Sequence, residues 1–324
     1  MEEMEKSRIG QFEVRTDLAL EERESFEGDG GEVSGVSLKE WDRKQTGVKL
    51  TEVRILNEQG AKAMGKPMGT YLTLEADRLS KKDDEYHSEI SDELGTQLKK
   101  LMDQMLKGQE RETLSVLVVG LGNPSVTPDS LGPRVLNNLQ VTRHLTGEYG
   151  EDFLKKRDLP AISGIIPGVM AQTGMETAEI LKGIIHQTRP QMLIVIDALA
   201  ARSVRRLGTT IQLTDTGIHP GSGVGNHRHS LTKDSLGIPV LAIGVPTVVG
   251  AAAIVDVYKR QEQARFSGRE RGNPADPSVR GHRGGFLRQP GRGCEGVGRE
   301  RPAAGCGYCA GPERRLQGLS LIHI

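Results

Sequence analysis

"VVGLGNPSVTPDSLGPR", the stretch Val118–Arg134, decides how the chain folds, because an apolar run passes through a glycine-rich turn into an aspartate and the start of a helix. The run begins at Leu114 and is continuous rather than alternating. Continuous apolar runs are typical of strands that are buried on both faces of a parallel sheet. The stretch therefore predicts a buried strand, a tight turn and a helix, the repeating unit of α/β domains.

The chain after this stretch alternates between helix-like and strand-like patterns. Helical patterns cover residues 130–139 and 175–188, and strand patterns cover residues 161–169, 191–198, 208–215 and 238–250. The alternation predicts a doubly wound or related three-layer α/β domain. We expect a three-layer phosphorylase/hydrolase-like fold with a mostly parallel central sheet.

The chain before this domain is more polar. Residues 48–76 alternate around a glycine-rich centre and predict a small N-terminal β-rich region, and residues 88–106 have the apolar spacing of an amphipathic helix. Residues 1–32 are charged and interrupted by glycine, with one semi-apolar patch, "FEVRTDLAL" at residues 12–20. We expect this first segment to bury little by itself.

The glycines of the opening stretch first suggest a phosphate-binding loop. Gly120 and Gly122 match the start of a dinucleotide fingerprint, but Ser125 stands where the third glycine is required. No Gly-Lys-Ser/Thr run follows. The sequence therefore disfavours a nucleotide site.

Two aspartates offer a different chemistry. Asp129 follows the glycine turn, where it could simply cap the next helix, and Asp197 closes the apolar strand "LIVIDA". Ligands of open α/β sheets bind beyond the carboxyl ends of the strands, so both acids are expected to face one crevice. Two close carboxylates resist simultaneous ionisation, and a protonated acid beside an ionised base can activate water and polarise a carbonyl. The pair predicts a hydrolytic site.

An abrupt change in residue usage marks the end of the body at about Val255. Residues 262–318 contain 11 Arg, 13 Gly and no Lys, whereas residues 1–255 contain 15 Lys and 15 Arg. The flanking hexamers, "DVYKRQ" at 256–261 and "LSLIHI" at 319–324, look like translations of the two strands of one library-preparation adapter. We therefore expect residues 256–324 to be a non-native, disordered tail on an interrupted protein.

Composition excludes several functional classes for the body. Residues 1–255 carry 30 basic and 36 acidic side chains, a net charge of −6, which provides no basic footprint for nucleic acid. No apolar run reaches the length of a membrane span, and the first residues lack the apolar core of a signal peptide. All three cysteines lie in the tail, where "CGYC" at 306–309 is only half a zinc site. We expect a cytoplasmic protein without disulfides, cofactor, membrane contact or direct nucleic-acid contact.

Five motifs occur in the order found in the spore germination protease family. Together with the N-terminal "VRTDLAL", they resemble that family over residues 5–255, which is essentially the whole body. The motifs are "VVGLGNPSVTPDSLGP", "IPGVMAQTGMET", "IDALAARS", "GIHPGSGVGN" and "AIGVPTVV".

The resemblance implies an atypical aspartic endopeptidase that needs no metal. Asp129 and Asp197 match its catalytic acids, and we add Asn123 and His219 as supporting residues. The implied enzyme is a homotetramer that degrades small acid-soluble spore proteins at germination, in the cytoplasm of the forespore and the spore core.

The resemblance also implies a zymogen that processes itself. Residues 1–17 would be the propeptide and residues 18–255 a protease domain truncated on its C-terminal side. The order acidic then aliphatic at Asp17 and Leu18 is similar to the sites that the family cuts in its substrates, so we expect cleavage between these two residues.

Three alternatives remain open. Peptidyl-tRNA hydrolase shares "GLGNP" at 120–124 and "TRH" at 142–144, but it begins at this strand and its tRNA suits an acidic body badly. A hydrogenase-maturation hydrolase would use Asp129, Asp197 and His219 to grip a metal, and His227 and His229 have a spacing that allows chelation. A non-catalytic binding module would use the glycine loops to contact a partner.

Overall fold

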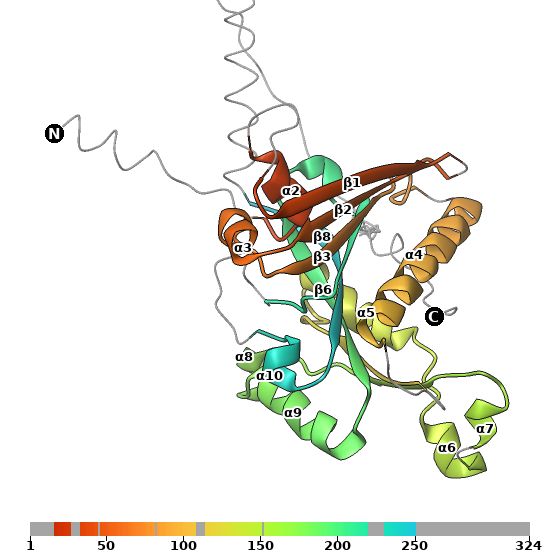
Figure 1. Ribbon diagram of the computed structural model, residues 1–324. Coiled ribbons are helices and arrows are strands. Elements are labelled where there is room, and N and C mark those ends of the chain that lie inside the picture. Colours follow the sequence, from red (N-terminus) through yellow and green to blue (C-terminus); the bar gives the residue numbers. More distant parts are fainter. Residues whose placement is uncertain are drawn as a thin grey trace, which may run out of the picture. The chain divides into compact units, whose positions relative to one another are not determined.

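The computed structural model describes residues 16–26, 33–44, 46–81, 83–107, 114–150, 152–219 and 230–250 (Figure 1). The predictions for residues 1–15, for His227 and His229 and for the tail 256–324 lie outside these described residues.

Eight strands form one sheet in the described part of the chain. They are β1 (Val36–Arg43), β2 (Val48–Ile55), β3 (Gly69–Glu75), β4 (Ser115–Gly120), β5 (Ala161–Ile165), β6 (Met192–Ala201), β7 (Thr210–Thr214) and β8 (Val240–Val249). Their order is β1-β2-β3-β7-β8-β6-β4-β5. The continuous apolar runs at 115–120 and 192–196 form strands, as predicted, and the structure shows that these strands, β4 and β6, are neighbours.

The sheet is mixed, which corrects the expectation of a mostly parallel sheet. The small N-terminal β-rich region is present as β1, β2 and β3, which belong to the same sheet. Strands β8, β6, β4 and β5 run parallel to one another, whereas β1, β2, β3, β7 and β8 pair in antiparallel fashion. The N-terminal strands join the sheet because β3 pairs with β7 from Tyr71↔Thr214 to Glu75↔Thr210. The α/β class is confirmed, and the phosphorylase/hydrolase-like assignment stays a prediction.

Helices flank the sheet between these strands. They are α2 (Ala19–Glu24), α3 (Glu58–Met64), α4 (Asp84–Met105), α5 (Leu131–Asn137), α6 (His144–Tyr149), α7 (Asp152–Lys155), α8 (Met170–Thr173), α9 (Thr177–Thr188) and α10 (Lys233–Leu236), with the 3-10 turns η1 (Thr127–Asp129) and η2 (Val204–Arg206). The predicted helix at 88–106 is α4, which begins earlier because Asp83 accepts a capping hydrogen bond from the backbone N–H of Tyr86. Among the described residues, none of the helices has both the length and the apolar character that crossing a membrane requires.

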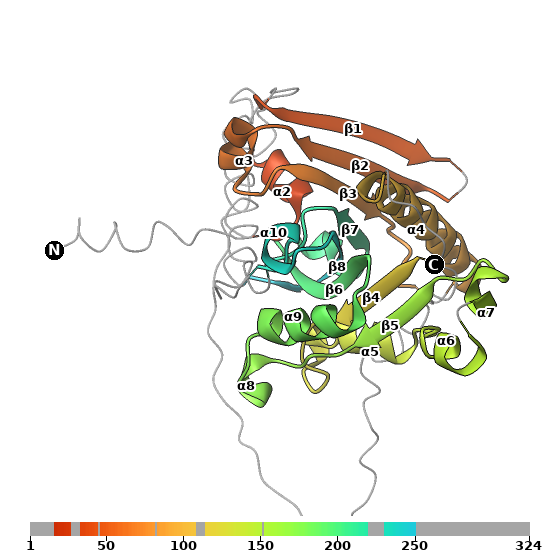
Figure 2. The same cartoon turned by 60° about the horizontal axis from the view of Figure 1, so that its bottom comes forward.

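The two faces of the sheet carry different helices (Figures 1 and 2). Successive residues of a strand point to opposite faces, so β6 divides its side chains between two clusters. Ile194 and Ile196 pack in the larger cluster beneath α4 and α5, and Leu193 and Val195 pack with α9 and α10. This alternation fixes the face on which Asp197, the next residue, must lie.

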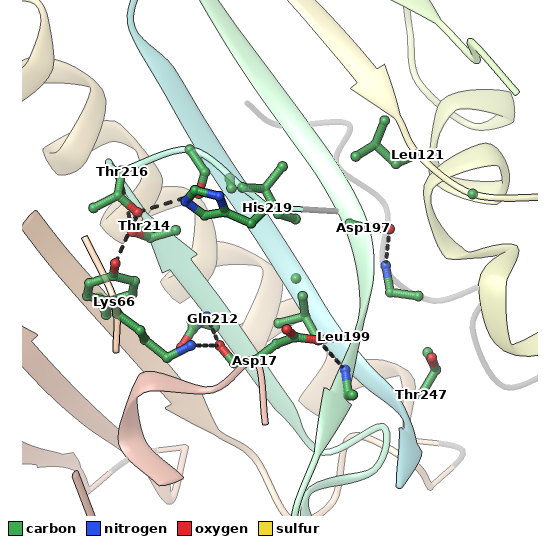
Figure 3. Close-up of a pocket in the computed structure, with 18 of the residues that line it drawn as sticks. Asp17, Lys66, Leu121, Asp197, Leu199, Gln212, Thr214, Thr216, His219 and Thr247 are labelled. Carbon is green, nitrogen blue, oxygen red and sulfur yellow. Dashed lines mark hydrogen bonds between the residues drawn. The ribbon is translucent and has the colours of Figure 1, made fainter. Parts of the chain in front are cut away.

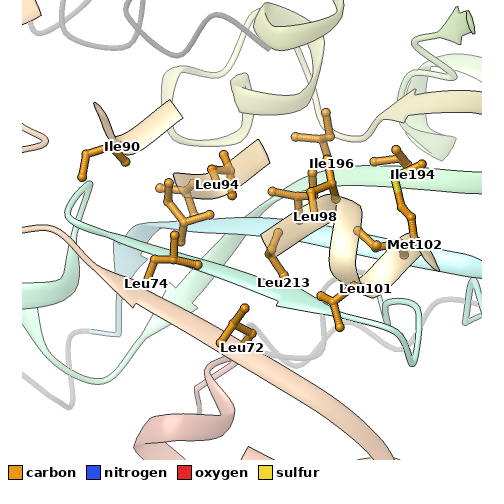
Figure 4. Packing of buried hydrophobic residues seen from close by; sticks show 14 of the residues in the cluster. Leu72, Leu74, Ile90, Leu94, Leu98, Leu101, Met102, Ile194, Ile196 and Leu213 are labelled. Carbon is orange, nitrogen blue, oxygen red and sulfur yellow. The ribbon is translucent and has the colours of Figure 1, made fainter. Parts of the chain in front are cut away.

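Helix α4 closes the larger cluster. Leu94, Leu98 and Met102 project from one side of the helix toward the sheet, where Ile194 and Leu213 meet them (Figure 4). The four-residue spacing places all three on one helical face. One sheet face is thereby covered by the larger hydrophobic cluster, whereas the other face carries the smaller cluster with α9 and α10.

We expect Leu98→Ala to lower the free energy of unfolding by about 2–5 kcal/mol, because the fully buried side chain leaves a cavity between α4 and the sheet. Urea unfolding followed by circular dichroism measures the change. Lys100→Ala, at an exposed position of the same helix, is the control and should change stability by less than about 0.5 kcal/mol. Equal losses for both variants would contradict this account of the core.

Candidate active site

A cavity of about 640 Å³ opens on the sheet face that α4 leaves free. It exists because two neighbouring strands part. Pairing of β4 with β6 ends at Gly120↔Ile196, and one more backbone bond, from the N–H of Leu121 to the carbonyl of Ile196, closes the pair. The chain of β4 then turns away while β6 continues, so the residues of β6 after Ile196 line an open space.

Asp197 is the first residue of β6 beyond this separation (Figure 3). Its side chain lines the cavity and is 8% exposed, and its Oδ1 accepts a hydrogen bond from the backbone N–H of Ala198 at 2.8 Å. The prediction that Asp197 closes its strand is wrong, because β6 extends to Ala201 alongside β8. The acid instead marks where the β4 neighbour ends, which has the same consequence for access.

Asp129 lines the same cavity from the turn after β4. Asp129 is partly exposed. Its Oδ2 accepts a hydrogen bond from the backbone N–H of Asn123 at 2.8 Å, and this bond links the two ends of the turn that follows Gly122. The N-cap position of α5 belongs to Ser130 rather than to Asp129. Asn123 is held in turn, since its Oδ1 accepts from the backbone N–H of Ser125.

The glycines around Asp129 serve close packing. Gly122 has φ +113°, and a Cβ there would lie 1.9 Å from the carbonyl oxygen of Asp129. A Cβ on Gly132 would lie 2.3 Å from the carbonyl oxygen of Leu121, and one on Gly120 would lie 2.4 Å from that of Gly132. The turn can therefore press against α5 only without side chains at these positions, which accounts for the "GLG" pattern without a phosphate.

Asp17 and Leu18 lie in or beside the same cavity, and the prediction that the N-terminal segment buries little is wrong for residues 16–20. Asp17 lines the cavity, and Leu18 is fully buried against Leu199 and Ala201 of β6. The backbone N–H of Asp17 donates to the carbonyl of Ala200 at 2.9 Å. Residues 16–20 of the semi-apolar patch therefore dock on the end of β6.

His219 also lines the cavity, near its edge. Burial and the neighbouring charge of Lys66 lower the pKa of His219. Within the described part of the chain, no group of three His, Cys, Asp or Glu side chains could hold a metal ion. The positive charge of Lys66 thus disfavours a second positive charge on His219.

Among the polar side chains of the cavity that sequence reasoning missed are Lys66 and Gln212. Lys66 follows the end of α3 and appears in the sequence as an ordinary surface lysine after "AMG". Gln212 is one polar residue in the alternating strand β7, a pattern that also fits a solvent-facing position. The signal in the sequence was that polar residues occupy alternate positions 210, 212 and 214, and the structure shows that all three are buried.

We expect Gly122→Ala to lower the free energy of unfolding by about 1–3 kcal/mol, because the positive φ becomes strained and the added methyl group displaces Asp129. Gly183→Ala is the matched control, since a Cβ there meets open space inside α9 and should stabilise the helix slightly. Urea unfolding compares the two. A Gly122→Ala protein as stable as the starting chain would contradict the packing role of the turn.

Comparisons with known proteins identify the family of this chain. The sequence profile of the peptidase family described as germination protease matches residues 13–264. The germination protease of Caldanaerobacter subterraneus subsp. tengcongensis is 48% identical over 245 residues, which cover 74% of this chain and 71% of that protein. Those of Clostridium tetani and Bacillus subtilis are 46% and 45% identical over 244 and 250 residues, covering 75% and 76% of this chain.

The chain spans 72% of the Clostridium tetani protein and 66% of the Bacillus subtilis protein. The profile match alone covers well over half of the 324 residues. The chain therefore belongs to the germination protease family, a family of peptidases.

Proposed function

We propose that this chain is an endopeptidase of the atypical aspartic type, with Asp129 and Asp197 as its catalytic pair. The observation that carries the proposal is that the two acids come from separate elements, the turn after β4 and the strand β6, and line one cavity. Their surroundings differ, because Asp197 is buried and Asp129 is partly exposed. Carboxyl groups in unequal surroundings can take different acid and base roles.

The proposed reaction is hydrolysis of a peptide bond in an extended chain. The ionised carboxylate takes a proton from water as the water oxygen attacks the carbonyl carbon, and the protonated carboxyl donates to the carbonyl oxygen. Collapse of the tetrahedral intermediate then breaks the C–N bond. The carboxyl group that took the proton from water gives it to the departing nitrogen, and the hydroxyl group formed from the carbonyl oxygen returns its proton to the other carboxylate. The mechanism uses only side chains of this chain and water.

The substrates that we propose are small acid-soluble spore proteins, cut during germination by a homotetramer in the forespore and spore core. Family membership supports this proposal, since the three relatives are all named germination proteases. It does not favour a peptidyl-tRNA hydrolase, a hydrogenase-maturation hydrolase or a binding module.

We also propose that the chain is a zymogen that cuts itself between Asp17 and Leu18. The location of these residues supports the proposal, because the segment lies against the cavity that holds the two acids. Leu18 is fully buried, so the bond must leave its place by local opening before it can be cut. We expect processing to be slow compared with the hydrolysis of an unstructured peptide for this reason.

We expect Asp129→Asn and Asp197→Asn each to lower the rate of peptide hydrolysis at least about a thousandfold, because an amide can neither accept nor donate the proton of a carboxyl group. A peptide that contains Thr-Asp-Leu-Ala, with a fluorophore and a quencher at its ends, reports the rate. Asp234→Asn, at an exposed position of α10, is the control. Wild-type turnover in either variant would remove that aspartate from the proposed pair.

We expect N-terminal sequencing of the processed protein to begin at Leu18, and processing to stop in Asp197→Asn. Mass spectrometry of the 324-residue chain over time measures the release of residues 1–17. A different first residue would contradict the bond assignment. Peptidase activity in a chain that keeps Met1 would contradict the zymogen proposal.

A further inference from the structure

The carbonyl oxygen of Asp17 accepts two side-chain hydrogen bonds inside the cavity (Figure 3). Lys66 Nζ donates to it at 3.0 Å, and Gln212 Nε2 donates to it at 3.3 Å. This carbonyl belongs to the peptide bond between Asp17 and Leu18, the bond that we propose is cut. One hydrogen bond is enough to satisfy this carbonyl oxygen, so the second donor calls for another explanation.

The contacts on either side bind this segment in one register. The carboxylate of Asp17 accepts a hydrogen bond from the backbone N–H of Ala200 at 2.8 Å. The backbone N–H of Asp17 donates to the carbonyl oxygen of Ala200. On the other side, Gln212 Oε1 accepts from the backbone N–H of Ala19 at 2.8 Å. Gln212 therefore spans residue 18 with both ends of its amide, and Leu18 itself fills an apolar pocket.

The scaffold holds the two donors on fixed backbone. Lys66 follows Gly65, which ends α3 in the left-handed conformation, and the N–H of Lys66 bonds to the carbonyl of Ala61. Gln212 lies in register with Gly244, which lies in register with Asp197 on the far side. Because neighbouring strands are about 4.8 Å apart, the Cα atoms of Gln212 and Asp197 are separated by about 10 Å, with no side chain on the glycine between them.

The positive charge of Lys66 indicates a role beyond donating a hydrogen bond to the carbonyl oxygen of Asp17. Burial lowers the pKa of Lys66, and the charges of Asp17, Glu22 and Glu21 oppose that effect. Holding an ammonium group in this place costs desolvation, whereas a neutral donor would bind a neutral carbonyl at less cost. An ammonium group gains where the residue that it binds also carries a negative side chain, as Asp17 does.

We propose that Lys66 and Gln212 are substrate-positioning residues that bind the carbonyl oxygen before the cleaved bond, and that Lys66 also selects an acidic residue at that position. The inference rests on the proposed endopeptidase function. The docked segment 16–19 represents the bound peptide, with its acidic residue beside Lys66 and its aliphatic residue in the pocket next to Leu199.

The test uses the 324-residue chain after release of residues 1–17, with two quenched-fluorescence peptides that contain Thr-Asp-Leu-Ala or Thr-Asn-Leu-Ala. For Lys66→Met we expect kcat/KM on the aspartate peptide to fall about 10- to 100-fold, mostly through a higher KM, because the hydrogen bond is already made in the bound peptide. The preference for the aspartate peptide over the asparagine peptide should disappear with the charge.

Two further variants separate the roles. Lys66→Gln keeps a donor without the charge, so it should lose the aspartate preference while its KM for the asparagine peptide rises less than in Lys66→Met. Lys62→Met, on an exposed position of α3, should keep both wild-type values. If Lys66 had only a structural role, Lys66→Met would reduce the fraction of active protein. The apparent kcat would then fall, while KM and the preference for the aspartate peptide would stay unchanged.

The outcomes distinguish the two proposals. If the wild-type chain cuts the peptides and Lys66→Met keeps the wild-type KM and preference, the positioning inference is wrong and the endopeptidase proposal stands. If the wild-type chain cuts neither peptide, both proposals are wrong.

Discussion

The separation of β4 from β6 after the Gly120↔Ile196 pair is the constraint on which the rest of the site depends. As long as the strands are paired, their polar groups satisfy one another and their side chains are covered by helices on both faces. Once β4 turns away, β6 continues beside β8 alone, and Asp197 is the first side chain to face the open space. The cavity is thus a consequence of topology, as is usual where neighbouring parallel strands of an α/β sheet diverge.

The turn that carries Asp129 depends on the same separation. The chain must reverse within a few residues against α5, and three glycines make that approach sterically possible. Asp129 then closes the turn by accepting the N–H of Asn123. Its position is therefore set by local backbone geometry, whereas that of Asp197 is set by a central strand.

A buried carboxylate, that of Glu21, holds the N-terminal segment in its place beside the cavity. Glu21, which is 2% exposed, accepts from the backbone N–H groups of Arg202 and Ser203 and from the hydroxyl of Thr16, and it forms an ion pair with Arg206. These partners satisfy a charge that would otherwise be costly to bury. Helix α2 is consequently anchored to the end of β6, and this anchor holds residues 16–18 against the cavity.

The sequence by itself determined the α/β class, the central strands, the long helices and the two acids that line the cavity. These features depend on local patterns: continuous apolar runs such as Val116–Val119, the apolar spacing of α4, and an acid placed directly after a strand or a turn. The glycines at 120 and 122 were recognisable as a special turn for the same reason.

Only the tertiary structure decided which strands pair, where the N-terminal segment lies and which further polar groups enter the cavity. The pairing of β3 with β7 joins residues about 140 positions apart, and no local pattern encodes such a contact. Lys66, Gln212 and Asp17 are likewise distant in the chain, and each alone resembles a surface residue. They meet at one carbonyl because the sheet brings β7 and the end of β6 together and because Glu21 fixes α2 beside them.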